Sequence, residues 1–199
     1  MNLYEALQQV ASVGNLDVDQ LLEYANEDKV AGKNQNGYSP ISVTRDEGRV
    51  LYALVRYLKP DVMVEVGSHS GCSATHILAA MHKNKRGHLY CVDPGGIVPP
   101  GIPDKYQGMY TVVLVDARYY EWPDRVDALH EDGDHTADLT SKTVSAAIAH
   151  GAKFVVSHDA HNASVGGEVT RAFNEATDGH YQTIEIDECG LGIAYWFKQ

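Results

Sequence analysis

Residues 64–77 have the sequence VEVGSHSGCSATHI, in which a β-branched run ends at one glycine and a helical stretch begins just after a second. Gly67 and Gly71 thus separate a predicted strand, Val62–Val66, from a predicted helix, Ser73–His82. Glycine at such a turn lets the backbone approach a ligand closely. The spacing is GxxxG and not the GxGxxG of dinucleotide enzymes, whose middle glycine makes room for a diphosphate. The stretch therefore predicts an α/β protein with a ligand-binding turn suited to a ligand without a diphosphate.

Short apolar runs alternate with helical stretches from this turn to the C-terminal end. The predicted strands are Leu89–Val92, Val112–Val115, Val126–Glu131 and Lys153–Ser157, and the predicted helices are Ala137–His150 and 167–176. The last two apolar runs, Tyr181–Asp187 and Gly192–Phe197, are too close together to hold a crossover helix, so they predict an antiparallel hairpin. The whole pattern indicates an α/β sheet with helices on its faces and one reversed edge strand.

The segment 1–43 predicts an N-terminal helical cap in front of a main domain, 44–199. Its helices are expected at 2–12 and 17–27, and a loop rich in Gly, Asn and Ser follows them. Thr44 and Glu47 have the spacing of a capping box, which predicts that the next helix begins there.

The composition excludes several classes of partner. With 199 residues, the chain is long enough for one domain to fold without a structural metal. Sixteen basic and 27 acidic residues give a net charge of −11, which argues against a nucleic-acid partner. The N-terminus lacks the features of a signal peptide, and no apolar run approaches about 18 residues, so we expect a cytoplasmic protein without a membrane partner. The oligomeric state, including a homo-oligomer, is left open.

Three cysteines, Cys72, Cys91 and Cys189, are far apart and form no CxxC pair. They predict buried free thiols and not a disulfide framework or a thiolate zinc site.

Acidic residues follow the predicted second and third strands. Asp93 lies roughly twenty residues after Gly71, where a carboxylate can accept hydrogen bonds from both hydroxyls of a ribose. Asp116 ends the third strand and is expected to meet an adenine edge. The segment Pro94–Gly108 contains four of the seven prolines and is expected to cover a ligand.

The chain resembles the class I S-adenosylmethionine-dependent methyltransferases, in particular the small-molecule O-methyltransferases with a DGDH motif that are related to the macrocin and catechol enzymes. The resemblance covers about residues 44–197 and rests on EGRVLYALVRYLKP, VEVGSHSGCSATHI, CVDP, EDGDHTAD, SHDAH and GLGIAYWF. It implies a Rossmann-like seven-stranded sheet of order 3-2-1-4-5-7-6, with strand 7 antiparallel. It also implies a cofactor site for S-adenosylmethionine. The methionine moiety would lie at Glu65 and Gly67, the ribose at Asp93, and the adenine at Asp116 and Ala117. Ser68 and Gly71 of the turn would also bind the cofactor.

Two acidic motifs, DGDH at 132–135 and SHDAH at 157–161, follow the predicted fourth and fifth strands. Neighbouring strands lie about 4.8 Å apart, so their ends can bring Asp132 and Asp159 to one ion. Carboxylates suit Mg²⁺ or Mn²⁺, and a nearby imidazole widens the choice to Zn²⁺ or Fe²⁺. In the metal-dependent relatives, two aspartates at these positions hold the cation with an adjacent asparagine. Here Ala160 stands in its place, so the third ligand would be His158 or His161.

His135 stands where the catechol-type enzymes have a catalytic lysine. An imidazole can accept a hydroxyl proton near pH 7, so we expect His135 to be the general base and Asp132 to act beside it. The predicted function is methyl transfer from S-adenosylmethionine to a hydroxyl group of a small molecule, assisted by a divalent cation.

Two alternatives remain from the sequence. The His/Asp cluster is also compatible with a metal-dependent hydrolase or phosphoesterase, and Ala160 with a non-catalytic cofactor-binding module. His130 and Glu131 occupy a strand position where relatives have aliphatic residues, and burial of a carboxylate there requires a partner. A structural role is the favoured interpretation for both.

Overall fold

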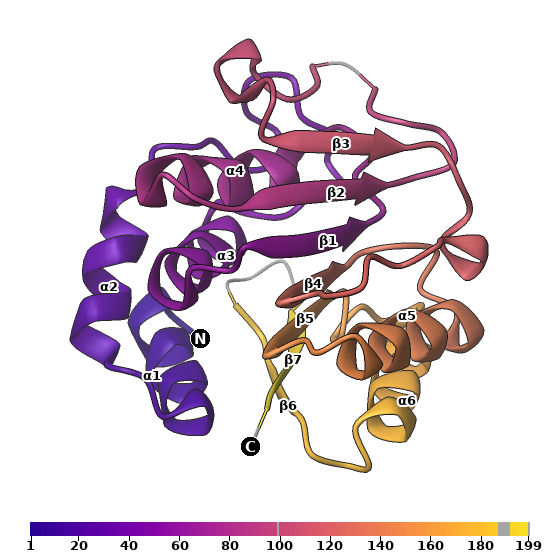
Figure 1. Cartoon of the computed structure of the whole chain (residues 1–199). Coiled ribbons are helices and arrows are strands. Elements are labelled where there is room, and N and C mark those ends of the chain that lie inside the picture. The colour runs from indigo at the N-terminus through magenta and orange to yellow at the C-terminus, as the bar shows by residue number, and fades with distance from the viewer. Residues whose placement is uncertain (99, 187–191, 199) are drawn as a thin grey trace.

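The computed structural model describes residues 1–98, 100–186 and 192–198, and its centre is a seven-stranded sheet (Figure 1). The strands are β1 (Val62–Val66), β2 (His88–Val92), β3 (Tyr110–Val113), β4 (Ala128–Glu131), β5 (Phe154–His158), β6 (Gln182–Ile184) and β7 (Ile193–Phe197). Their order is β3-β2-β1-β4-β5-β7-β6, and β7 is antiparallel to both of its neighbours. The predicted Rossmann-like sheet with a reversed strand 7 is therefore confirmed.

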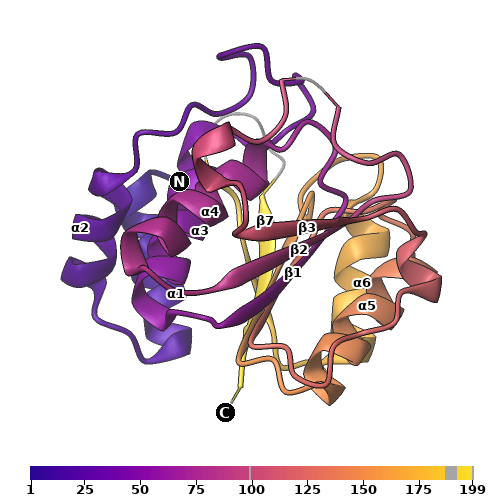
Figure 2. The ribbon, with the colours of Figure 1, turned by 45° about the horizontal axis from the view of Figure 1, so that its top comes forward.

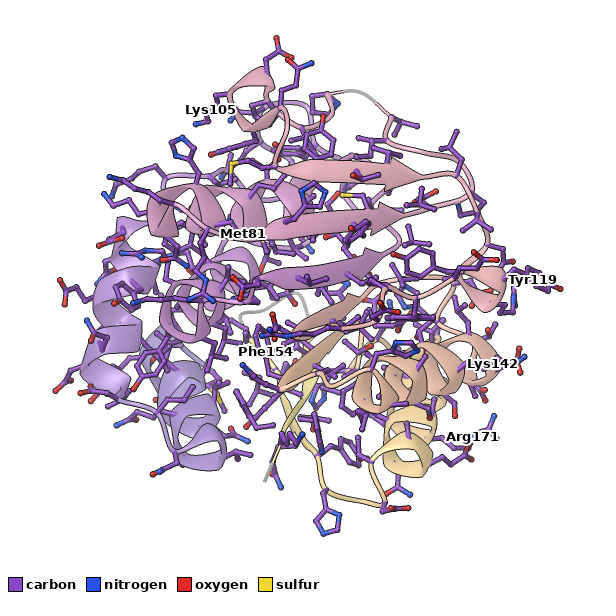
Figure 3. The ribbon with its side chains drawn as sticks, in the orientation of Figure 1. Met81, Lys105, Tyr119, Lys142, Phe154 and Arg171 are labelled. Atoms are coloured by element: carbon purple, nitrogen blue, oxygen red, sulfur yellow. The ribbon has the colours of Figure 1, made fainter. Side chains whose placement is uncertain are left out.

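Helices cover both faces of the sheet (Figures 1 and 2). One face carries α1 (Leu3–Gly14), α2 (Val18–Glu27), α3 (Arg45–Leu58) and α4 (Cys72–Asn84), and the other carries α5 (Ala137–Ala149) and α6 (Gly166–Ala176). Alternate residues of each central strand face the two helical layers: Met63 packs with the first and Val64 with the second. Figure 3 labels Met81 and Phe154, which are buried in the first layer. Such double coverage is typical of parallel sheets.

The N-terminal helices belong to the main core. Ala6, Leu7 and Val10 of α1 and Leu21 of α2 are fully buried in the same apolar cluster as Met63. The α1 helix also contacts β6 and β7, so it lies against strands from the opposite end of the chain. The α1 helix thus packs on the sheet, and α2 packs against α1 and α3.

The third strand differs in position from its prediction. It spans Tyr110–Val113, two residues earlier than the predicted Val112–Val115. Among the described strands it pairs with β2 alone, and β2 ends at Val92 opposite Val113. The described strands therefore offer no partner to Leu114, which is 72% exposed. The final hairpin is confirmed, although β6 is shorter than predicted and Asp187 lies outside the described residues.

Cys72 and Cys91 are buried free thiols, as predicted. Cys189 lies outside the described residues. No helix in the described part of the chain is both long and apolar enough to cross a bilayer.

Candidate functional site

A cavity of about 630 Å³ opens at the carboxyl ends of the parallel strands. Its wall includes most of the predicted site residues, namely Gly67, Ser68, Asp93, Asp116, Ala117, Asp132, His135 and Asp159. The loop between α2 and α3 adds Lys33, Pro40, Ile41 and Ser42. Chain segments that are far apart in the sequence therefore meet in one hollow, at the place where open α/β sheets bind ligands.

Gly67 allows the exits of β1 and β4 to touch. It has a φ of +82°, and a Cβ atom there would lie 1.9 Å from the backbone oxygen of Asp132. The Gly67 amide donates to the Val92 carbonyl (2.9 Å), and the Asp132 amide donates to the Val66 carbonyl (2.9 Å). The turn is therefore fixed from both neighbouring strands.

Asp93 is held by backbone amides that point its carboxylate to the cavity. Oδ2 accepts from the His69 amide (3.0 Å), and Oδ1 accepts from the Gly95 amide (2.8 Å). Each oxygen keeps a further lone pair, so the carboxylate can still accept from a diol.

The proline-rich segment Pro94–Gly108 packs mainly against the glycine turn. The Val98 amide donates to the His69 carbonyl (2.9 Å), and Ile102 lies against Gly71. Tyr106 is buried in the core. Of the described residues in this segment, Pro94 lines the cavity, so the geometry does not support the predicted ligand-covering role for the rest.

Asp116 follows β3 after two intervening residues and begins a short 3₁₀ turn, Ala117–Tyr119, instead of ending the strand as predicted. Its carboxylate accepts from the Arg118 guanidinium at 2.7 Å (Nη2) and from the Arg118 amide at 2.9 Å. Arg118 Nη1 also lies 3.3 Å from Asp134. Hydrogen bonds from the Arg118 side chain hold the pKa of Asp116 below its usual value, so this end of the cavity carries fixed charges.

Glu65 does not reach the cavity, in contrast to its predicted place beside the cofactor. It is fully buried in β1, where Oε1 lies 3.2 Å from His130 Nδ1 on the adjacent β4 strand. Glu65 Oε2 and His130 Nε2 have no hydrogen-bond partner among the described residues. Gly71, also predicted to bind the cofactor, is the N-cap residue of α4, with a φ of +74°, and is not among the residues that line the cavity.

Glu131 is fully buried on the opposite face of β4, and its carboxylate accepts three hydrogen bonds. The donors are the hydroxyls of Thr140 (3.1 Å) and Ser157 (3.2 Å) and the amide of Gly133 (3.2 Å). Burial raises the pKa of Glu131. These bonds link β4, β5, α5 and the DGDH loop, which accounts for a carboxylate in a central strand.

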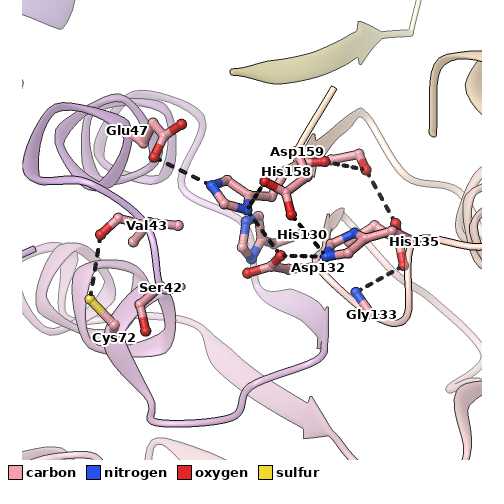
Figure 4. Close-up of polar contacts among 12 residues, drawn as sticks. Ser42, Val43, Glu47, Cys72, His130, Asp132, Gly133, His135, His158 and Asp159 are labelled. Atoms are coloured by element: carbon pink, nitrogen blue, oxygen red, sulfur yellow. Dashed lines mark hydrogen bonds and ion pairs between the residues drawn. The ribbon is translucent and has the colours of Figure 1, made fainter. Parts of the chain in front are cut away.

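Four of the predicted chemical residues form one cluster (Figure 4). His135 Nε2 lies 3.1 Å from Asp159 Oδ2 and 3.7 Å from Asp132 Oδ1. His158 Nδ1 lies 3.1 Å from Asp132 Oδ1 and 3.5 Å from Asp159 Oδ1. The two carboxylates thus lie between the two imidazoles, as expected for the ends of neighbouring strands.

His158 is almost fully buried, with its second ring nitrogen, Nε2, 3.3 Å from Glu47 Oε2. Burial alone would lower the pKa of His158, but Asp132 and Glu47 outweigh it and raise the pKa well above the usual value. The same contact helps to hold the pKa of Asp132 low, against the effect of its own burial.

The donor set fits a divalent cation. One ligand atom each from Asp132, His158 and Asp159 lies within 4.8 Å of the others. Asp159 Oδ1 is buried without a hydrogen-bond partner among the described residues, as expected for an atom that ligates an ion. His161, the other imidazole considered for this site, is exposed and packs beside Gly192.

The contributors to the site that sequence reasoning missed include Glu47 and Arg118. Glu47 was recognised only as part of a capping box, which it does form with Thr44, and its contact with His158 spans 111 positions in the chain. Arg118 was also missed, because its link to Asp116 depends on the turn between them. The Glu47 contact has no local signal in the sequence, whereas Arg118 lies only two positions after Asp116.

Residues 64–160 match the profile of a protein family described as "Methyltransferase domain". No curated protein matches the sequence.

Similar solved structures include the O-methyltransferase TomG from Streptomyces achromogenes in complex with SAM (TM-score 0.62, 14% identity, 89% of this chain and 88% of that chain). Another is SAH-bound methyltransferase PaMTH1 from Podospora anserina (TM-score 0.55, 12% identity, 91% of this chain and 88% of that chain). A third is a SAM-dependent O-methyltransferase from Thermotoga maritima (TM-score 0.58, 12% identity, 78% of this chain and 66% of that chain). At these identities the likeness establishes the fold. The domain match over residues 64–160 is a likeness to the same class of protein that the sequence resembles.

Proposed function

We propose that this protein transfers a methyl group from S-adenosylmethionine to a hydroxyl group of a small molecule. The observation that carries the proposal is that one cavity is lined both by the glycine turn with Asp93 and by the cluster of Asp132, His135 and Asp159. Its volume lies within the range of small-molecule sites, roughly 300–1,000 Å³. The SAM and SAH complexes of TomG and PaMTH1 support the choice of cofactor.

The cofactor would lie across the carboxyl ends of β1 and β2. Asp93 would accept hydrogen bonds from the ribose, Ala117 would pack near the adenine, and the fixed charges of Asp116 and Arg118 would border it. The methionine part would lie at Gly67 and Ser68, where the absence of a Cβ permits close approach. In this arrangement the sulfonium methyl group would be transferred beside the DGDH loop, which lines the same cavity.

The protein would then hold the acceptor oxygen in line with the methyl group and remove its proton. His135 would accept the hydroxyl proton as the oxygen–carbon bond forms and the carbon–sulfur bond breaks, with the electron pair passing to sulfur. Its Nε2 faces Asp159 at 3.1 Å, and this contact orients the ring. A divalent cation at Asp132, His158 and Asp159 would lower the pKa of the acceptor hydroxyl.

The two alternatives explain less of the cavity. A metal-dependent hydrolase would use Asp132 and Asp159 but leaves the Gly67 turn and the amide-held Asp93 without a role. A non-catalytic binding module would account for the cofactor-binding half of the cavity but would leave the ordered contacts of His135 without a role.

Calorimetry with S-adenosylmethionine and its demethylated product tests the cofactor assignment. We expect wild-type protein to bind both, and Asp93→Ala to weaken binding by about 100-fold, because two hydrogen bonds to a charged group are lost at more than about 1.4 kcal/mol each. Asp138→Ala is the matched control, since Asp138 is an exposed aspartate outside the cavity. Wild-type protein that binds neither compound would exclude the proposed function.

A further inference from the structure

His158 is buried between carboxylates from distant parts of the chain (Figure 4). Its Nε2 lies 3.3 Å from Glu47, whereas its Nδ1 faces Asp132 at 3.1 Å and Asp159 at 3.5 Å. When an ion displaces the hydrogen from Nδ1 and Nε2 donates to Glu47, the Nδ1 lone pair points toward two carboxylate groups. A cation placed between His158 Nδ1 and the carboxylates of Asp132 and Asp159 would attract all three groups.

Glu47 is fixed independently of His158. Its Oε2 accepts from the Thr44 amide at 2.8 Å in the capping box of α3, and the residue is 1% exposed. Histidines that bind metals usually donate their other ring N–H to a carboxylate or carbonyl, which sets the tautomer and the ring orientation. Glu47 occupies that outer position relative to His158.

A second observation points to an ion at the same place. Asp159 is 8% exposed, and its Oδ1 is buried without a hydrogen-bond partner among the described residues. This atom lies 3.5 Å from His158 Nδ1, on the side of the ring that faces away from Glu47. A buried carboxylate oxygen that accepts no hydrogen bond and lies beside an imidazole nitrogen is an arrangement that a metal ion satisfies.

We infer that Glu47 is a positioning residue that presents His158 as a metal ligand, and that the resulting site prefers a transition-metal ion to Mg²⁺. The donors are one imidazole nitrogen and two carboxylates, from His158, Asp132 and Asp159. Mg²⁺ favours oxygen ligands and keeps its water, whereas imidazole suits Zn²⁺, Fe²⁺ and Co²⁺. The neighbouring residue Ala160 supplies no side-chain oxygen that would favour Mg²⁺.

The inference rests on the cation site of the proposed function and is independent of methyl transfer. Its test therefore uses metal binding by the full chain without S-adenosylmethionine. Tag-free protein is freed of metal with a chelator and titrated with Co²⁺, followed by calorimetry and by the visible absorption of cobalt. Mg²⁺ is titrated separately and as a competitor. We expect one Co²⁺ site with at least 100-fold higher affinity than for Mg²⁺.

The variants separate the role of Glu47 in metal binding from its role in the helix cap. Glu47→Ala is expected to lower Co²⁺ affinity by 10- to 100-fold, as for other carboxylates behind a ligating histidine. Glu47→Gln keeps an acceptor for both Thr44 and His158, so it should recover most of the affinity. Thr44→Ala breaks the same capping box but keeps the carboxylate, so it should lower Tm and leave Co²⁺ affinity unchanged.

His158→Gln should reduce Co²⁺ affinity at least tenfold and remove the visible spectrum typical of nitrogen ligation. Equal affinity for Mg²⁺ and Co²⁺ in the wild-type protein would overturn the inference. So would a Glu47→Ala variant that binds Co²⁺ with the same affinity as the wild-type protein. If Glu47→Ala does not fold, the decision rests on His158→Gln and on the nitrogen NMR shift of the His158 ring in wild-type protein with Zn²⁺. An unchanged ring signal would then reject the assignment.

Discussion

Gly67 combines a backbone requirement with a steric one. Its φ is +82°, a region that costs other residues about 1–2 kcal/mol, and an added Cβ would lie 1.9 Å from the Asp132 carbonyl. We expect Gly67→Ala to lower the free energy of unfolding by about 2–4 kcal/mol. The β1 and β4 exits must move apart, so S-adenosylmethionine binding should fall as well. Urea unfolding and calorimetry measure the two effects.

Gly37→Ala is the matched control for this substitution. Gly37 also has a positive φ, +80°, but nothing lies within 4 Å of an added Cβ. It should therefore show the conformational cost alone, with unchanged cofactor binding. Equal losses for both variants would mean that close packing on Asp132 contributes nothing.

His135 is the residue whose side chain is expected to act only during the reaction. With any hydroxyl acceptor that the wild-type protein methylates, His135→Gln should lower kcat by about 100-fold or more, because a positioned base typically contributes that much. The affinity for S-adenosylmethionine should stay within about twofold. Transfer of a radiolabelled methyl group measures kcat, and His180→Gln serves as the exposed-histidine control. Wild-type turnover in His135→Gln would exclude His135 as the base.

Single residues of the site could be predicted where a strand ends. Asp93, Asp132 and Asp159 each come directly after a strand, and parallel strands bring such positions to one edge of the sheet. Glu65 shows the limit of this reasoning, because alternation along a strand decides whether a side chain faces a helix layer or the cavity. Glu47 shows another limit, since its partner is chosen by the packing of α3 against the end of β5.

Asp127 joins two strands at the opposite end of the sheet. Its Oδ2 accepts from the backbone amides of Asp61 (2.9 Å) and Val62 (3.1 Å), and Oδ1 accepts from Arg125 (2.6 Å). Burial alone would raise the pKa of Asp127, but these hydrogen bonds outweigh it and hold the pKa below its usual value. The charged form therefore stabilises the start of β1 against β4.

We expect Asp127→Asn to lower the free energy of unfolding at pH 7 by about 1–3 kcal/mol, as for hydrogen bonds to a charged group. A group with a lowered folded pKa contributes fully above its unfolded pKa, about 3.9, and loses that contribution as pH falls through its folded pKa. The difference between the variant and the wild type should therefore shrink below about pH 4. Urea unfolding at pH 7 and pH 3 measures it, and an equal difference at both values would contradict the assignment.

The positions of the strands could be predicted best where both faces of the strand are buried. The β1, β4 and β5 strands lie in the middle of the sheet, where almost every residue is buried, although Glu65, His130 and Glu131 interrupt their apolar runs. The prediction for the edge strand β3 was two residues too late, because the apolar run Val112–Val115 continues past the end of β2. The length of an edge strand is decided by its neighbour, which periodicity does not reveal.

On the scale of the whole molecule, the N-terminal helices were the least predictable part. Their apolar faces were visible in the sequence, but the surface that they cover was not. Leu7 packs in the core shared with the central strands, and α1 contacts β6 and β7. The segment 1–43 also adds Lys33 and Ile41 to the cavity wall, so it contributes to both stability and the site.

Leu7→Ala tests whether the chain unfolds as one unit. Leu7 is fully buried, so the substitution should cost about 2–5 kcal/mol, a large part of the roughly 5–15 kcal/mol of a typical domain. Both tryptophans, Trp122 and Trp196, lie outside the segment 1–43 and report on the rest of the fold. If the helices share the core, tryptophan fluorescence and circular dichroism will shift to the same lower urea midpoint in one transition. An unchanged fluorescence midpoint would instead make the segment an independent cap, and Tyr4→Ala, on the exposed side of α1, is the control that should change neither signal.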